Sequence, residues 1–189
     1  KIIITGHTGF KGSWLSLWLY SKGAKVIGVS KNIPTQPSLF KILKLKSKIK
    51  NYFTDLNLKN NLREIIKKHQ PDYIFHLAAQ AIVSKSYTNP KDTFMSNAIG
   101  TLNILESLKY LKKKCYVIII TSDKSYKNIE LKRGYHEKDL LGGKDPYSAS
   151  KACAENIIYS YFESFLKKKK NLKIAIARAG NVIGGGDWS

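Results

Sequence analysis

Tyr147 and Lys151 lie four residues apart at the start of a segment whose continuation, residues 152–165, predicts a helix. Side chains at this spacing share one helix face about one turn apart. We expect the Lys151 ammonium to favour the phenolate and so to lower the pKa of Tyr147. A tyrosine tuned in this way can take a proton from a substrate hydroxyl while a hydride leaves the same carbon. The alternative is a surface Tyr and Lys on an ordinary helix.

A second group of polar residues follows a buried apolar strand. Residues 115–121 predict the strand, and Ser122, Asp123 and Lys124 come directly after it. Polar residues at the carboxyl end of a central parallel strand stand where such folds bind ligands. For Lys124 the structural alternative is a salt bridge to Asp123.

A glycine-rich turn connects a first strand, residues 1–5, to a helix predicted over residues 13–22. Gly6 would permit a tight turn, and Gly12 would let the helix pack closely on the strand. Gly9 would let a pyrophosphate approach the helix N-terminus, where free N–H groups and the helix dipole favour anions. The position of the turn between a strand and a helix makes the dinucleotide-binding interpretation stronger than the glycines alone would.

The ends of the next two strands supply further candidates for cofactor contacts. Strand 26–30 ends at Ser30 without the acid that often holds ribose hydroxyls, and Lys31 could accept a 2′-phosphate, so the residues leave NAD and NADP open. The third strand ends in the segment 52–56. There Asp55 can either accept a hydrogen bond from an adenine amino group or cap a helix predicted over residues 57–68.

A fourth strand, residues 72–76, leads into small residues, Leu77-Ala78-Ala79-Gln80, on whose backbone a nicotinamide ribose can lie. We interpret His76 as a core histidine and not as a ligand. Asn97 points inward from a long helix predicted over residues 90–110. A buried amide needs hydrogen-bond partners, and we expect Asn97 to brace the active-site loop.

Strands alternate with helices along the chain up to a sixth strand at residues 172–178. This order predicts an α/β fold, a doubly wound parallel sheet with right-handed crossovers. We expect residues 1–189 to form one Rossmann domain, and the family resemblance given below implies that a smaller substrate domain is missing after Ser189. Without a signal peptide or an apolar run of membrane-spanning length, we expect a cytoplasmic protein with no membrane partner. Cys115 and Cys153 are predicted to be structural thiols in a reducing compartment.

The formal charge of +20 raises nucleic-acid binding as a hypothesis. Of the 33 basic residues, however, only Arg63, Arg133 and Arg178 are Arg, the preferred reader of phosphates and bases. The lysines are scattered over the faces and ends of the predicted helices. We therefore expect no nucleic-acid partner, and we expect the charge to attract an anionic small substrate.

The glycine turn, Ser122, Tyr147 and Lys151 together resemble the extended short-chain dehydrogenase/reductase superfamily. Longer runs are similar to the CDP-glucose 4,6-dehydratase family within it, and the likeness covers essentially all 189 residues. The most specific runs are Gly-His-Thr-Gly-Phe-Lys-Gly-Ser-Trp (residues 6–14) and Gly-Asn-Val-Ile-Gly-Gly-Gly-Asp-Trp (residues 180–188).

The resemblance implies an NAD-dependent hydro-lyase that converts CDP-glucose to CDP-4-keto-6-deoxyglucose. A hydride would move from sugar C4 to NAD and return to C6 after water is eliminated across C5–C6. Tyr147 would remove the 4-hydroxyl proton, Ser122 would hydrogen-bond the 4-oxygen, and Lys151 would orient the nicotinamide ribose. Asp123 would protonate the leaving 6-hydroxyl. Lys124 replaces a Glu base of related dTDP-glucose dehydratases, so it must be partly neutral through burial or must stabilise an enolate.

The resemblance and the residues together assign the binding positions. The cofactor contacts are Gly6, Thr8, Gly9, Phe10, Gly12, Ser30, Asp55, Leu56, Leu77, Ala78, Ala79, Gln80, Asn97, Tyr147 and Lys151. The substrate contacts are Gln80, Ser84, Arg178 and Asn181. Ser84 stands where many relatives carry Arg. No metal is implied.

The resemblance also implies a homo-oligomer, a dimer or tetramer, paired through the helices over residues 90–110 and 145–165. Two other enzymes stay open, another nucleotide-sugar dehydratase and a 4-epimerase. An epimerase needs no acid/base pair at C5–C6, so Asp123 and Lys124 argue against it. An alternative of another class is a catalytically silent NAD-binding regulator.

Overall fold

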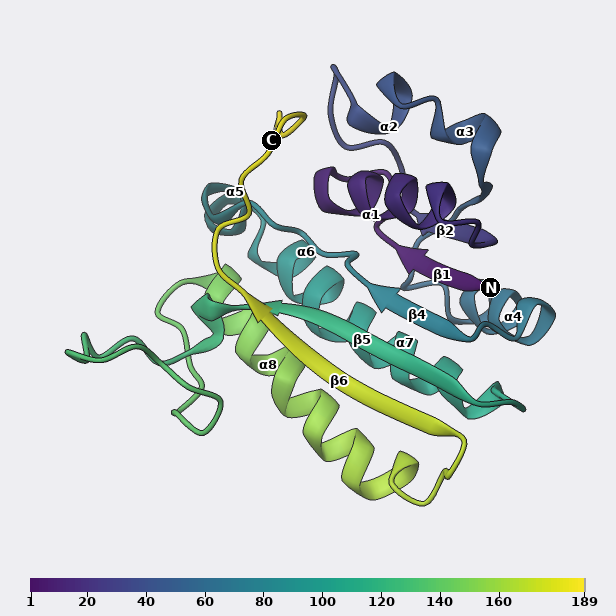
Figure 1. The fold of residues 1–189 in the computed structure, drawn as a ribbon. Helices are drawn as coiled ribbons and strands as arrows, with labels where there is room; N and C mark the ends of the chain where they lie inside the picture. The colour runs from purple at the N-terminus through teal and green to yellow at the C-terminus, as the bar shows by residue number, and fades with distance from the viewer. Residues whose placement is uncertain (189) are drawn as a thin grey trace.

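A six-stranded parallel sheet organises the computed structural model, which describes residues 1–188 apart from the side chain of Lys59 (Figure 1). The spatial order is β3-β2-β1-β4-β5-β6, so the predicted doubly wound α/β fold is confirmed. The strands are β1 (Ile2–Thr5), β2 (Val26–Ser30), β3 (Lys50–Phe53), β4 (Tyr73–His76), β5 (Cys115–Ser122) and β6 (Leu172–Ala179).

The position of β1 in the middle of the sheet explains its continuous apolar sequence. It pairs in register with β2 on one side and β4 on the other. Ile3 and Ile4 point to opposite faces, and both are fully buried. A parallel strand covered on both faces needs apolar residues at every position. The reversal of strand order between β1 and β4 opens the crevice at their carboxyl ends where such sheets bind ligands.

Helices cover the two faces of the sheet unequally. They are α1 (Phe10–Ser21), α2 (Leu39–Ile42), α3 (Leu45–Lys48), α4 (Lys59–His69), α5 (Val83–Thr88), α6 (Pro90–Phe94), α7 (Gly100–Ser107) and α8 (Pro146–Tyr161). The larger core lies where α4, α7 and α8 pack on one face, and a smaller one lies under α1 on the other. On the α1 side, β5 and β6 run uncovered in Figure 1, and Ile176 is exposed.

Several predicted boundaries differ from the observed ones. The helix over residues 90–110 is interrupted by a π-helical turn at Met95–Ile99 and ends in a 3₁₀ turn at Leu108–Tyr110. Helix α1 begins at Phe10, three residues earlier than predicted. Of the two predicted structural thiols, Cys115 is buried and Cys153 is exposed, so the prediction is wrong for Cys153.

Among the helices that lie within residues 1–188, none combines the length and the apolar character needed to cross a membrane.

Candidate active site

A cavity of about 640 Å³ opens at the carboxyl ends of the strands. This volume lies within the usual range for small-molecule and cofactor sites. We call residues 6–12 with Ser30 and residues 77–80 the glycine wall, and Ser122, Lys124 and Tyr147 the catalytic wall; both walls line the cavity. The segment 180–188 runs from β6 toward α1 and α2 and borders the same space (Figure 1).

Two glycines of the glycine wall are required by its geometry. Gly6 has a φ of +74°, and a Cβ there would lie 2.7 Å from the Ala78 backbone nitrogen. A Cβ on Gly12 would lie 2.1 Å from the carbonyl oxygen of Gly6. The predicted roles of both glycines are therefore confirmed. Gly9 is the N-cap of α1, so the first N–H groups of that helix are available to an anion in the cavity.

A buried histidine, which the sequence reasoning missed, holds the glycine turn in place. His7 Nδ1 lies 2.9 Å from Ser30 Oγ, and His7 Nε2 lies 2.9 Å from Asn51 Oδ1. Burial lowers the pKa of His7, against the opposing effect of its hydrogen bonds to Asn51 and Val29. Gly28 is the residue of the sequence that could have indicated this buried histidine, because a Cβ at position 28 would overlap the His7 imidazole ring.

Thr8 and Ser30 complete this part of the wall. The Thr8 backbone N–H donates to Ser30 Oγ over 3.3 Å, and the Thr8 hydroxyl donates to the Asn32 carbonyl oxygen over 2.6 Å. Both residues line the cavity, as does Phe10. The turn is thus fastened to the end of β2 by side-chain hydrogen bonds in addition to its own backbone geometry.

Asp55 lines the far end of the cavity, as does Leu56. Asp55 Oδ1 accepts a hydrogen bond from the Asn57 backbone N–H at 2.9 Å, and Oδ2 pairs with Lys31 Nζ at 2.9 Å. Burial raises the pKa of Asp55, but these two partners lower it by more. The alternative role as a helix cap is wrong, because α4 begins at Lys59 with Leu58 as its N-cap.

The loop after β4 is braced from behind. The Gln80 backbone N–H donates to Asn97 Oδ1 over 2.8 Å, and Asn97 Nδ2 donates to the Gln80 carbonyl oxygen and to Ser150 Oγ. The predicted bracing role of Asn97 is confirmed. Asn97 and Lys151 are buried behind the cavity and do not line it, so their cofactor contacts stay predictions. The π-helical turn that carries Asn97 is of a kind that often occurs at functional sites.

The polar atoms of the Gln80 side chain are used within its own loop. Nε2 donates to Thr93 Oγ1 and to the Ile82 carbonyl oxygen, and Oε1 accepts from the Ile82 N–H. Ser84 is exposed and lies outside the cavity lining, and its predicted substrate contact stays a prediction. Its neighbour Lys85 lines the cavity instead and is a candidate that the sequence reasoning did not assign.

His76 lies in the core, as predicted. Its Nδ1 is 2.7 Å from Thr5 Oγ1, and its Nε2 is 3.2 Å from Thr101 Oγ1. Complete burial and the charge of Lys151 lower its pKa to about 3. This neutral, hydrogen-bonded imidazole ties β1 and β4 to α7.

Tyr147 and Lys151 share the predicted face of α8, but their electrostatics differ from the prediction. Burial raises the pKa of Tyr147, and its hydrogen bond to Ser122 opposes that effect only in part. Lys151 Nζ lies 6.0 Å from the centroid of the tyrosine ring. Burial and the nearby Lys11 lower the pKa of Lys151 to about 8, although Glu155 acts in the opposite direction. The predicted lowering of the Tyr147 pKa is therefore wrong for this state.

The start of α8 fixes where Tyr147 stands. Asp145 is the N-cap, and its carboxylate accepts from the Ser148 backbone N–H at 3.0 Å and from the Ser148 hydroxyl at 2.6 Å. Pro146 occupies the first helical turn, where its missing N–H costs nothing. Tyr147 is consequently held in the first turn of the helix with its side chain against the cavity.

A 3₁₀ turn at Asp123–Ser125 carries the other catalytic candidates. Ser122 Oγ donates to Asp123 Oδ1 over 3.1 Å and accepts from the Lys124 backbone N–H at 3.2 Å. Lys124 lines the cavity but is exposed, which contradicts one of its two predicted alternatives, an amine kept neutral by burial. Within residues 1–188, Asp123 and Lys124 form no ion pair with each other. Asp123 is exposed beside the cavity lining.

Of the two candidates in the last segment, Asn181 lines the cavity and Arg178 does not. Arg178 Nε lies 2.9 Å from each carboxylate oxygen of Glu155, and its predicted substrate contact stays a prediction. The segment is held to α1 by the Trp14 indole, which donates to the Gly185 carbonyl oxygen over 2.9 Å. Lys11, also in α1, lines the cavity and was not assigned from the sequence.

In the part of the chain that the structure describes, no three His, Cys, Asp or Glu side chains converge to hold a metal ion.

A family model described as GDP-mannose 4,6 dehydratase matches residues 3–181. The chain belongs to this family. A CDP-glucose 4,6-dehydratase from Salmonella typhimurium is 44% identical over 100% of the chain and 54% of its own length. The chain thus spans about half the length of the curated relatives it matches.

Solved structures of related enzymes share this fold. A UDP-glucose 4-epimerase from Thermotoga maritima, solved with UDP-glucose, has a TM-score of 0.82 and is 28% identical. A UDP-glucose 4-epimerase from Thermus thermophilus, solved in complex with NAD, has a TM-score of 0.76 and is 26% identical. Each match covers 97% of the chain and 56% of the other protein.

Proposed function

We propose that the full-length protein is a nucleotide-sugar 4,6-dehydratase that converts CDP-glucose to CDP-4-keto-6-deoxyglucose with NAD as its bound cofactor. The proposal rests on one observation: the glycine wall, which suits a dinucleotide, lines the same cavity as Ser122 and Tyr147. The similarity to a CDP-glucose 4,6-dehydratase along the whole chain supports this choice of sugar nucleotide. Membership of the dehydratase family supports the type of reaction.

The residues present fit NAD. The close approach of Gly12 to Gly6 brings the N-terminus of α1 to the edge of the cavity, and this end would hold the pyrophosphate. Asp55 would hold the adenosine end, and residues 77–79 would pack on the nicotinamide ribose. When bound, NAD supplies a temporary acceptor for the C4 hydride, which later returns to C6. The NAD-bound epimerase structure is consistent with this proposal.

The catalytic wall would handle the protons at C4. Tyr147 would remove the proton of the 4-hydroxyl, and Ser122, which lines the same cavity, would hold the 4-oxygen. Because burial raises the pKa of Tyr147, this step needs nearby positive charge. Lys151 supplies that charge at pH values below about 8, the value to which burial lowers its pKa.

The 3₁₀ turn would carry the elimination. Asp123 would give a proton to the leaving 6-hydroxyl, and the C5 proton would pass to water in the open cavity. The Lys124 ammonium would stabilise the negative charge that develops on the 4-oxygen as the C5 proton leaves. The exposure of Lys124 favours this electrostatic role over that of a base kept neutral by burial. Asn181 would contact the substrate diphosphate from the segment that borders the cavity.

We further propose that residues 1–189 form the cofactor-binding half of the protein and that the remainder supplies most of the substrate domain. A length of about half that of the curated relatives supports this division. A homo-oligomer paired through the helices predicted at 90–110 and 145–165 stays a prediction.

A 4-epimerase is the second candidate function, because the two solved structures above are epimerases. Both reactions begin with removal of the C4 hydrogen, so the glycine wall and Tyr147 suit either. The candidates differ in the later steps, since only a dehydratase needs groups acting at C5 and C6. Asp123 and Lys124 supply such groups, which favours the dehydratase.

Mass spectrometry of the full-length protein tests the proposal. The protein is incubated with NAD and, separately, with CDP-glucose, dTDP-glucose, UDP-glucose and GDP-mannose. Loss of one water from CDP-glucose, faster than from the others, is expected. Water lost chiefly from another sugar nucleotide would correct the substrate, and a sugar inverted at C4 without a change in mass would establish the epimerase.

A further inference from the structure

Glu155 is a buried carboxylate to which the proposed function gives no role. It lies on α8 one turn beyond Lys151, and only 2% of its surface is exposed. Burial of an ionised carboxylate is costly unless the group is paired and hydrogen-bonded. The partners of Glu155 show what its charge is used for.

Two of these partners bracket the 3₁₀ turn of the catalytic wall. The Thr121 hydroxyl donates to Glu155 Oε1 over 2.7 Å, and Ser125 Oγ lies 3.0 Å from the same oxygen. Ser125 Oγ also lies 2.7 Å from the Ser122 carbonyl oxygen. One carboxylate oxygen therefore contacts the residues immediately before and after Ser122, Asp123 and Lys124.

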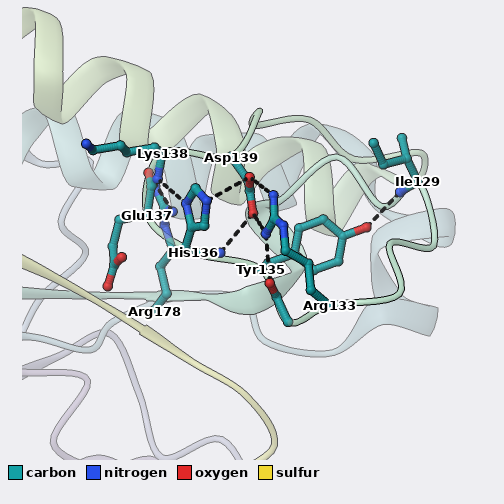
Figure 2. Close-up of polar contacts among 9 residues, drawn as sticks. Ile129, Arg133, Tyr135, His136, Glu137, Lys138, Asp139 and Arg178 are labelled. Atoms are coloured by element: carbon teal, nitrogen blue, oxygen red, sulfur yellow. Dashed lines mark hydrogen bonds and ion pairs between the residues drawn. The ribbon is translucent and has the colours of Figure 1, made fainter.

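The charge of Glu155 is balanced by Arg178 at the end of β6. Arg178 Nε donates to both carboxylate oxygens, and Nη2 donates to Oε2 at 2.5 Å. The guanidinium also lies 4.5 Å from the centroid of the Tyr126 ring, and its Nη1 donates to the Glu137 carbonyl oxygen over 3.3 Å. Figure 2 shows Arg178 beside Glu137 and the polar cluster of Arg133, His136 and Asp139.

These contacts join four parts of the chain at the Glu155–Arg178 pair: α8, the end of β5, the end of β6 and, through Arg178, the loop after Tyr126. The two elements that carry the catalytic candidates are α8 and the end of β5. Tyr147 and Lys151 stand on the first, and Ser122, Asp123 and Lys124 follow the second. A rigid link between them sets the distance between the residues acting at C4 and those acting at C5 and C6.

We propose that Glu155, held by Arg178, is a positioning residue that fixes the turn of Ser122, Asp123 and Lys124 against Tyr147. This inference rests on the proposed function. Neither Glu155 nor Arg178 lines the cavity, so both act through other residues. A displacement of about 1 Å at a reacting centre can lower the rate about 100-fold.

The test uses the full-length protein with the sugar nucleotide that the wild type dehydrates fastest. Glu155→Gln keeps the shape of the side chain and removes its charge. We expect kcat to fall about 100-fold, with little change in KM or in the dissociation constant of NAD. Glu163→Gln is the matched control, because Glu163 follows α8 on the surface and pairs with Lys167, which is itself exposed. It should leave kcat unchanged.

The double variant Glu155→Gln/Arg178→Gln separates positioning from stability, because it removes both buried charges together. We expect it to recover the melting temperature that Glu155→Gln loses while kcat stays low. Recovery of kcat along with stability would overturn the proposal and leave a purely structural ion pair. Glu155→Asp, which keeps the charge on a shorter side chain, should recover part of kcat.

The outcomes distinguish this proposal from the proposed function. If the wild type removes water from no nucleotide sugar, the proposed function fails. If the wild type is active and Glu155→Gln retains its kcat, the positioning role alone fails.

Discussion

The two walls of the cavity are built in different ways. The glycine wall consists mainly of backbone, with Gly6 and Gly12 in close contact and His7 buried behind them. The catalytic wall consists of side chains, and Lys124 is exposed. The first wall is complete in the fold itself, whereas the second depends on protonation states that burial and neighbouring charges set.

Tyr147 of the catalytic wall and its buried neighbour Lys151 show this dependence. Burial raises the pKa of Tyr147 and lowers that of Lys151 to about 8, so in each case it disfavours the charged form. A phenolate and an ammonium therefore form here only with support from a neighbouring or bound charge. Variants in the glycine wall should consequently affect binding and folding, and variants in the catalytic wall should affect rates and pH dependence.

Gly12→Ala should have the largest effect. Its Cβ would lie 2.1 Å from the Gly6 carbonyl oxygen, so the backbone must move. We expect a loss of more than about 4 kcal/mol of unfolding free energy and loss of NAD binding, measured by urea denaturation and calorimetry of the full-length protein. Gly134→Ala is the control, because a Cβ there meets nothing within 4 Å. Normal NAD binding by Gly12→Ala would show that the wall is not rigid.

Tyr147→Phe should lower kcat by about 10²–10⁴-fold, the range typical of a lost acid/base group. The dissociation constant of NAD should change much less, because the glycine wall is untouched. Tyr159→Phe is the matched control on the same helix, since Tyr159 is 71% exposed. A kcat near that of the wild type would remove Tyr147 from the proton transfer at C4.

Lys11→Met should move the pH dependence of NAD binding. Lys151 faces Lys11 from α1, His76 from β4, and Tyr147 and Glu155 from its own helix. NAD affinity should fall as the pH rises through about 8, because the Lys151 ammonium is then lost. Without the Lys11 charge, this midpoint should move to higher pH. The dissociation constant measured by calorimetry between about pH 6 and 10, on either side of the Lys151 pKa, gives the midpoint.

The lowered pKa of Lys151 also predicts how the stability of the protein changes with pH. The pKa of Lys151 is about 8 in the folded protein, whereas its ordinary value is 10.5, so between these values the unfolded chain binds more protons at this residue. Its contribution to the unfolding free energy therefore rises with pH across this window. The control for the Lys11→Met experiment on NAD binding is Lys22→Met, at the exposed end of α1. It should leave the pH midpoint of NAD binding unchanged.

Lys31→Met should have the smallest effect. The side chain is 73% exposed, and its ion pair with Asp55 is on the surface. Exposed pairs contribute at most about 1 kcal/mol and are screened by salt. Urea denaturation at low and high salt should show a small loss that disappears at high salt. A loss of several kcal/mol would mean that this end of the cavity depends on the ion pair more than its exposure indicates.

The sequence predicted best what depends on short segments. The glycine turn and the start of α8 follow from residue types that are adjacent in the chain, and the placement of Asn97 follows from its apolar neighbours in one helix. The π-helical turn at Met95–Ile99 has no comparable local signal. The third strand ends at Phe53, within the segment 52–56 in which its end was predicted.

What the sequence did not predict depends on tertiary partners. Arg178 lies at the end of β6, just before the motif at residues 180–188, and this position suggested a substrate contact. Its partner Glu155, however, lies on a helix 23 residues earlier in the chain. The pKa of Tyr147 was predicted from one neighbour on the helix, whereas burial by the surrounding elements has the larger effect. The exposure of Lys124 was likewise not predictable, because its neighbours along the chain do not determine whether its side chain is buried.

The central claim is that one cavity removes a hydride from C4 and returns it to C6 of the same sugar. The most direct measurement gives the full-length protein CDP-glucose labelled with deuterium at C4 and locates the label in the product by NMR. We predict a 4-keto-6-deoxy product with one water lost and the deuterium at C6. Deuterium found at C4 of an epimerised sugar, or no product from labelled CDP-glucose, would contradict it.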